Sequence, residues 1–386
     1  MTRRAGVLCS LLAGSAVLFA ALFFTCPEAR QKFVFPDTSY CDYRVFMLPC
    51  MESGINYSPK KINRFDACYP PIAYYLASSL STDKGISWLP QKREWLYLAS
   101  IALMEILGLG LILGTLPGKR LLAFGAVVLS PAVISSVLRG NPSGWAFALV
   151  ALFLRAYRSP DARWRAVAAL SLALAVALKL TPVLFGLMYL AENPLKPAKW
   201  PWRQIALAAV AAAVLLLLPF AGCGGFEAMG RWFANALENS RHYSMQDPIW
   251  GFVALVNRFD PSLEIPRLTN AAIVLTNLAA ALMAALALAA KSAYARLAAI
   301  GIAMAFLTHH DYGAAYLLPA FAAFLADESF RDRPEARVVT LLECVAWFIV
   351  LTPLQIPDPA GGSLNFALQG EALLLLAAAV VIRIRA

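Results

Sequence analysis

The sequence predicts an all-α polytopic membrane protein with about 11–12 transmembrane or partly spanning helices and two long outer loops. Apolar residues make up 60% of the 386 positions, and charged residues make up 15%. An ordinary soluble domain carries about 25% charged residues. Apolar runs of membrane-spanning length also recur from one end of the chain to the other. These observations exclude a soluble enzyme, a disordered chain and a fibrous repeat, and they favour one integral-membrane domain over residues 1–386.

The first apolar run follows Arg3 and Arg4, which predict a helix that starts in the cytoplasm. We expect this helix to be retained, because no small-x-small cleavage pattern is obvious and many further runs follow. Several of these runs are shorter than the roughly 20 residues that cross a bilayer, so some helices are expected to end inside a protein-lined cavity. The predicted helices cover residues 5–24, 94–114, 121–138, 144–157, 166–178, 182–191, 204–220, 268–290, 295–307, 313–326, 338–351 and 364–382.

Lysine and arginine are distributed unevenly between the connections, as the positive-inside rule expects. If every run crosses, each inner loop carries at least two basic residues, whereas the short outer connections carry only Arg139 and Lys179. The inner loops are then residues 119–120, 155–165, 192–203, 291–296, 329–337 and 383–385. The formal charge of +10 is explained by these loops, so no nucleic-acid partner is expected.

The same rule predicts three sharp turns. A single helix over residues 166–190 would bury Lys179 and put two basic loops on opposite sides, so two segments are predicted to meet at Lys179. Equivalent turns are predicted at residues 139–143 and 309–312. These three turns therefore share the outer side.

Two long loops, residues 26–93 and 221–267, lie on that outer side as well. A helix runs inward from each turn, and Ser143, Thr181 (before Pro182) and Asp311 are expected to cap these helices. A helix N-terminus carries partial positive charge and unpaired N–H groups, which suit a phosphate. The polar chemistry of the chain is thus predicted to lie at one membrane boundary.

Four charged or titratable side chains at the turns favour recognition of a lipid phosphate. Arg139 and Lys179 contribute positive charge, and His309 and His310 contribute hydrogen-bond donors that can also carry protons. Each has an alternative interpretation: a lone Lys or Arg often anchors a helix at the interface, and a His pair often lies in a solvated turn. Agreement among three turns in one layer favours the functional reading.

The first outer loop contains candidate catalytic acids and a group of cysteines. Any one of its carboxylates could act as a general base on a sugar hydroxyl, while the others remain solvated. These acids are Asp37, Asp42, Glu52, Asp66 and Asp83. The cysteines Cys26, Cys41, Cys50 and Cys68 predict one or two disulfides with open pairing, and Cys223 lies in the other long loop. Cys9 and Cys344 are expected to be buried in helices, and no metal or other cofactor is expected.

Four ordered blocks resemble glycosyltransferase family 87 of the GT-C superfamily, whose members are polyprenyl-phosphate-mannose-dependent mannosyltransferases. The blocks are Asp42-Tyr43-Arg44-Val45-Phe46 with Gly54, Tyr57 and Tyr69-Pro70-Pro71; Arg139-Gly140-Asn141-Pro142 with Lys179-Leu180-Thr181-Pro182; residues 246–259; and His309-His310-Asp311-Tyr312 with Leu317-Leu318-Pro319. Two departures stand out. Asn141 replaces the usual Gln, and residues 245–248 replace Asn-Gln-Ser-Leu.

The resemblance implies a GT-C-like bundle that moves a hexose, by family default mannose, from a polyprenyl-phosphate donor to a glycolipid or glycan acceptor, with inversion. By carry-over Asp42 is the base, and Lys179, Arg139, His309 and His310 surround the phosphate. Tyr69 and Asp66 line the acceptor side. The implied location is a bacterial inner membrane, with the site facing outside and membrane lipids around it. One alternative is a transporter or lipid flippase, which typically has broken helices near the midplane and repeated halves. Another is a non-catalytic scaffold of a cell-envelope complex.

Overall fold

In the computed structural model, the residues that the structure describes form helices joined by turns, with no strand among them. These are residues 3–25, 47, 51, 55, 57, 69–81, 94–114, 116, 120–242, 253, 256–257, 259–260, 262, 265–308, 311–327, 334–354 and 364–385. Asp42, Asp66, His309, His310 and the four loop cysteines lie outside them. An all-α membrane protein is therefore confirmed.

The α-helices are α1 (Arg3–Thr25), α4 (Pro71–Ser81), α5 (Glu94–Leu113), α6 (Arg120–Val127), α7 (Pro131–Arg139), α8 (Ser143–Ala156), α9 (Ala162–Leu178), α10 (Leu187–Leu190), α11 (Trp202–Leu217), α12 (Gly225–His242), α14 (Ile265–Ala289), α15 (Ala293–Thr308), α16 (Leu318–Ala326), α17 (Ala336–Leu351) and α18 (Leu364–Arg385). The 3₁₀ segments are η2 (Thr181–Gly186), η3 (Pro197–Lys199), η4 (Leu218–Cys223) and η5 (Asp311–Leu317).

Helix length agrees with the expected mixture of complete and partial spans. Within the described residues, four helical stretches are long and apolar enough to cross a bilayer: 6–25, 96–113, 202–223 and 270–289. Shorter apolar helices cover residues 143–156, 181–190, 293–307 and 313–326. Each of these short helices packs against several neighbouring helices.

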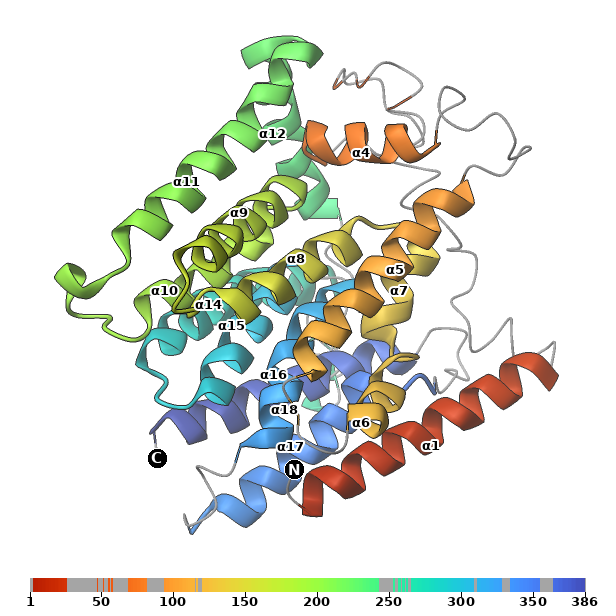
Figure 1. The fold of residues 1–386 in the computed structure, drawn as a ribbon. Helices are drawn as coiled ribbons and strands as arrows, with labels where there is room; N and C mark the ends of the chain where they lie inside the picture. The colour runs from red at the N-terminus through yellow and green to blue at the C-terminus, as the bar shows by residue number, and fades with distance from the viewer. Residues whose placement is uncertain are drawn as a thin grey trace.

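Figure 1 shows α11, α9, α8 and α5 side by side in one layer, each packed against the next. The α15 helix lies in the core, because it packs on α14, α16, α18, η2 and η5. Every residue from Ala298 to Phe306 is buried, as expected for a helix that is apolar on all sides. A Cβ on Gly301 would lie 2.9 Å from the carbonyl oxygen of Tyr316, so η5 folds back closely onto α15.

One predicted helix is wrong. The run 121–138 forms two helices, α6 and α7, because Pro131 has no N–H to continue the helix through Ser130. Ser130 has the extended values φ −67° and ψ 153°, and Pro131 starts α7, the position where proline is favoured.

Two helices within the predicted outer loops, residues 26–93 and 221–267, were not predicted from the sequence. Helix α4 buries Ala73, Tyr74 and Ala77 along one face, and α12 buries Ala228 and Trp232. Each is shorter or more polar than a membrane span, so a search for apolar runs does not detect it. Figure 1 shows both at the same end of the molecule, where each packs against η4.

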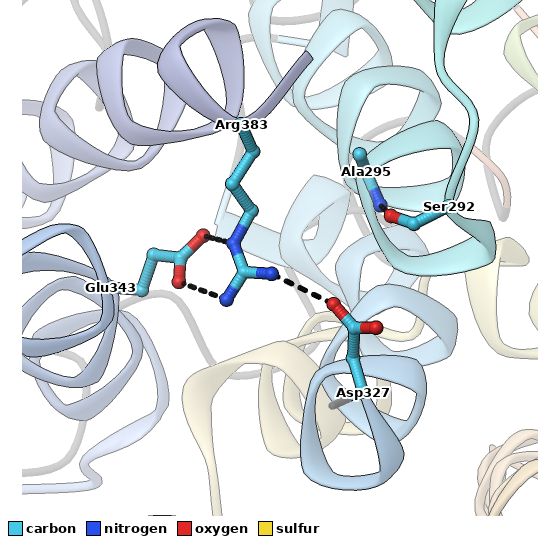
Figure 2. Close-up of polar contacts among 5 residues, drawn as sticks. All are labelled: Ser292, Ala295, Asp327, Glu343 and Arg383. Carbon is cyan, nitrogen blue, oxygen red and sulfur yellow. Dashed lines mark hydrogen bonds and ion pairs between the residues drawn. The ribbon is translucent and has the colours of Figure 1, made fainter. Parts of the chain in front are cut away.

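A buried ion cluster joins α16, α17 and α18 (Figure 2). The Arg383 guanidinium donates from Nε to Glu343 Oε1 at 2.7 Å and from Nη2 to Oε2 at 2.8 Å. Its Nη1 donates to Asp327 Oδ2 at 2.7 Å, and its Cζ lies 4.9 Å from the centre of the Tyr294 ring. Nearby, the Ser292 hydroxyl accepts the N–H of Ala295 at the start of α15. The cluster fixes the C-terminal helix against the helix that precedes it.

Candidate active site

The turn between α7 and α8 ends one helix and starts the next within three residues. Gly140 adopts φ 66° and ψ 41°, a left-handed conformation that costs glycine little. Its N–H donates to the Val137 carbonyl at 3.1 Å, and the Asn141 N–H donates to the Ser136 carbonyl at 2.8 Å. This pair of bonds is a Schellman motif, which satisfies the carbonyls at the end of α7. The predicted break at residues 139–143 is thus confirmed.

Asn141 is fully buried and organises the start of α8. Its Oδ1 accepts the backbone N–H of Ser143 at 2.9 Å and the Ser143 hydroxyl at 2.6 Å. The expectation that Ser143 itself caps α8 is therefore wrong. Ser143 already lies in the first turn, and the side chain two residues earlier accepts its N–H, as in an Asx turn.

Lys179 lies where α9 ends, and its backbone is extended, with φ −158° and ψ 125°. The Lys179 Nζ donates to the Ser143 Oγ at 2.7 Å, so two of the predicted turns meet through this contact. The predicted break at Lys179 is confirmed. Thr181 does not cap the next helix as expected, since that segment is 3₁₀ and the buried Thr181 hydroxyl has no partner among the described residues.

Tyr69 brings the first outer loop into the same cluster. Its hydroxyl accepts the Asn141 Nδ2–H at 2.7 Å, and its carbonyl accepts the Tyr57 hydroxyl at 2.9 Å. The Tyr69 N–H donates to the Tyr74 hydroxyl at 3.3 Å. A continuous hydrogen-bond chain therefore runs from Lys179 through Ser143 and Asn141 to Tyr69. We call these four residues the Lys179 chain.

A second contact from the same loop supports the turn. The Tyr97 hydroxyl on α5 lies 2.8 Å from the Gly140 carbonyl oxygen and 3.0 Å from the Met47 sulfur. Met47 is fully buried and lies five residues after Asp42 in the sequence. Two separate points of the loop, Met47 and Tyr69, are thus held at the α7–α8 turn.

Arg139 is the last residue of α7 and is half-buried beside this turn. The η5 segment, which begins within the third predicted turn, also lies here, because it packs against α7 and α8. His309 and His310 precede η5 but lie outside the described residues, as do Asp42 and Asp66. The structure therefore brings together Lys179, Tyr69 and the end of α7. It also shows that Asn141, Ser143 and Tyr97 connect them, which the sequence did not reveal.

A polar contact between Tyr75 and Cys223 joins α4, within the long loop 26–93, to η4. The Tyr75 hydroxyl and Cys223 Sγ lie 3.2 Å apart. The hydrogen bond to Cys223, together with burial, raises the pKa of Tyr75 to about 12. Cys223 is a free thiol. Cys9 is buried in α1 as expected, whereas Cys344 is half-buried on α17.

The sequence was compared with protein-family models, curated proteins and solved structures, and it matches one family model. No curated protein and no solved structure matches the chain. The sequence model of glycosyltransferase family 87 matches residues 67–310, a range that contains Tyr69, Arg139, Lys179, His309 and His310 and begins after Asp42. Since this match covers more than half of the 386 residues, the chain belongs to glycosyltransferase family 87 and is a membrane glycosyltransferase.

Proposed function

We propose that the protein moves a hexose, in the first instance mannose, from a polyprenyl-phosphate donor to a glycolipid or glycan acceptor. The transfer takes place on the extracytoplasmic face of a bacterial inner membrane, inside one integral-membrane domain of residues 1–386. Membership of a glycosyltransferase family supports sugar transfer over the transporter or flippase alternative.

The Lys179 chain carries the proposal. It joins a cationic side chain, the start of α8 and the first outer loop in one cluster. The α8 N-terminus contributes partial positive charge, and the Lys179 ammonium contributes a full one. A lipid monophosphate needs this combination of positive charge and N–H donors beside an apolar bundle. Arg139, His309 and His310 complete the donor site in this proposal.

The reaction is a single displacement at the anomeric carbon of the donor. Asp42 takes the proton from the acceptor hydroxyl, and the hydroxyl oxygen forms its bond to the anomeric carbon as the bond to the phosphate oxygen breaks. The configuration inverts, and the leaving group is a polyprenyl monophosphate. Lys179 and Arg139 stabilise the negative charge that develops on the phosphate. Tyr69 and Asp66 line the acceptor side.

A donor panel tests this function directly. Purified protein in lipid nanodiscs is incubated with polyprenyl-phosphate mannose, glucose, galactose and arabinose, and release of the free lipid phosphate is measured. We expect phosphate release with at least one donor, and the fastest release with mannose. Sugar-independent movement of lipid across liposomes, with no phosphate release from any donor, would instead support the flippase alternative.

Replacing Lys179 by Ala is expected to weaken donor binding. A hydrogen bond to a charged group contributes about 1.5–3 kcal/mol, so the donor KM should rise by roughly tenfold to a hundredfold. The exposed Lys199 provides a matched control, since Lys199→Ala removes an equal charge far from the Lys179 chain. An unchanged donor KM in Lys179→Ala would remove this lysine from the phosphate site.

A further inference from the structure

A buried carboxyl lies beside the turn that carries Asn141 and Ser143 of the Lys179 chain. Glu105 is in the middle of α5, a helix apolar enough to cross the membrane, and its side chain is 1% exposed. Its Oε1 accepts a hydrogen bond from the Ser136 hydroxyl. Its Oε2 is buried and has no hydrogen-bond partner among the described residues. An acidic side chain inside a spanning helix is costly, so its presence calls for a role.

Glu105 supports the α7–α8 turn from the side of α7. Ser136, which donates to the Glu105 carboxyl, also holds the turn through its backbone, because its carbonyl accepts the Asn141 N–H at 2.8 Å. Asn141 in turn binds both Ser143 and Tyr69. A displacement of Ser136 is therefore passed directly to the residue at the centre of the Lys179 chain.

Glu105 also supports the turn from the side of α8. Gly144 follows Ser143, and a Cβ at this position would lie 2.9 Å from Glu105 Cγ and 2.6 Å from Ile101 Cγ2. Helix α8 thus begins in close contact with the Glu105 side chain. The Glu105 side chain therefore contacts the backbone segments on both sides of the turn. It meets Ser136 before the turn and Gly144 after it.

The η5 segment also packs against α7 and α8 at this turn. Tyr316 on η5 is fully buried, and its hydroxyl has no hydrogen-bond partner among the described residues. Its side chain lies close to those of Ser143 and Glu105. Buried polar side chains of α5, α8 and η5 therefore lie close together beside the Lys179 chain.

We propose that Glu105 is a positioning residue of the donor site: its carboxyl holds the α7–α8 turn so that Ser143 meets Lys179. This inference rests on the proposed function, because it assigns Glu105 to the residues that hold the donor phosphate. Glu105 acts through its shape and its hydrogen bond to Ser136. The conservative variant Glu105→Gln keeps both, whereas Glu105→Leu keeps only the approximate volume.

Steady-state kinetics separate positioning from a purely structural role. Losing one hydrogen bond in a preorganised site is expected to raise the donor KM of Glu105→Leu roughly tenfold, with the acceptor KM within about twofold of wild type. Glu105→Gln is expected to stay within about threefold of wild type for both substrates. Ser136→Ala should raise the donor KM in the same direction as Glu105→Leu.

Ser171→Ala is the matched control for Ser136→Ala, because the buried Ser171 hydroxyl bonds to Val167 within its own helix, α9. It should leave both KM values unchanged. A wild-type donor KM in both Glu105→Leu and Ser136→Ala overturns the proposal. So does an equal loss for donor and acceptor in Glu105→Leu that Glu105→Gln does not rescue.

Direct binding of a polyprenyl monophosphate in nanodiscs distinguishes this inference from the function on which it rests. Weaker binding by Glu105→Leu than by Glu105→Gln supports the positioning role even if no donor in the panel is consumed. Equal binding by the two variants, in a protein that does transfer sugar, contradicts the role of Glu105 while the proposed function stands.

Discussion

Asp42→Asn is expected to abolish sugar transfer while donor binding and membrane insertion are retained. Asparagine has nearly the same shape as aspartate, but it cannot accept the proton of the acceptor hydroxyl. Removal of a general base lowers turnover by about 10²–10⁴-fold. The loop that carries Asp42 is held at the α7–α8 turn through Met47 and Tyr69, which supports a role for this loop beside the donor. Single-turnover release of polyprenyl phosphate measures the effect on the chemical step.

Asp83→Asn is the control for this experiment, since Asp83 is another acid of the same loop and lies outside the family blocks. It should transfer sugar at the wild-type rate. Donor binding by Asp42→Asn, measured with the polyprenyl monophosphate, should equal that of wild type. Turnover within about threefold of wild type in Asp42→Asn would assign the base to a different group, because a general base contributes far more than this.

The breaks in the helices could be predicted because they follow from charge and hydropathy. Lys179 divides an apolar run, and the positive-inside rule places basic loops on one side, so a turn at Lys179 was required. The split at Pro131 was missed because the residues on both sides are apolar, and hydropathy does not register a lost backbone N–H. Helix α12 was missed for a different reason. It buries only one face, so its mean composition is that of a polar loop.

Candidate residues of the site were predictable as types, but their contacts were not. A lysine at a helix end indicates a possible anion site, yet nothing in the sequence indicates that Ser143 accepts its hydrogen bond. Asn141 was recognised only as a departure from the family pattern. Its position between Ser143 and Tyr69 depends on packing between segments 72 residues apart. Glu105 is visible as the acid in the interior of the run 94–114, whose other acid, Glu94, is its first residue. The neighbours of Glu105 on α7 and α8 emerge only from the fold.

Arg383→Met is expected to destabilise the protein more than any of the substitutions at the donor site. The Arg383 side chain is 5% exposed, and its guanidinium lies between the carboxylates of Glu343 and Asp327, which are 0% and 10% exposed. Removing one partner of a buried ion pair costs about 3–5 kcal/mol, because the remaining charges stay buried without compensation. Thermal unfolding in detergent measures this loss. Arg385→Met, two residues later on the exposed side of α18, should leave the midpoint unchanged.

A second substitution identifies the source of the loss. If uncompensated charge is responsible, Arg383→Met combined with Glu343→Leu should be more stable than Arg383→Met alone, because an apolar pair of similar volume often replaces a buried ion pair at little cost. Asp327 is the more exposed of the two acids and lies just beyond α16, so water can solvate its carboxylate in the double variant. If the double variant is less stable than Arg383→Met, the ion cluster stabilises α18 through specific geometry, and charge compensation is not its main role. Arg383, Glu343 and Asp327 bond to one another and are not members of the Lys179 chain, so sugar transfer per folded molecule should be unchanged in all these variants.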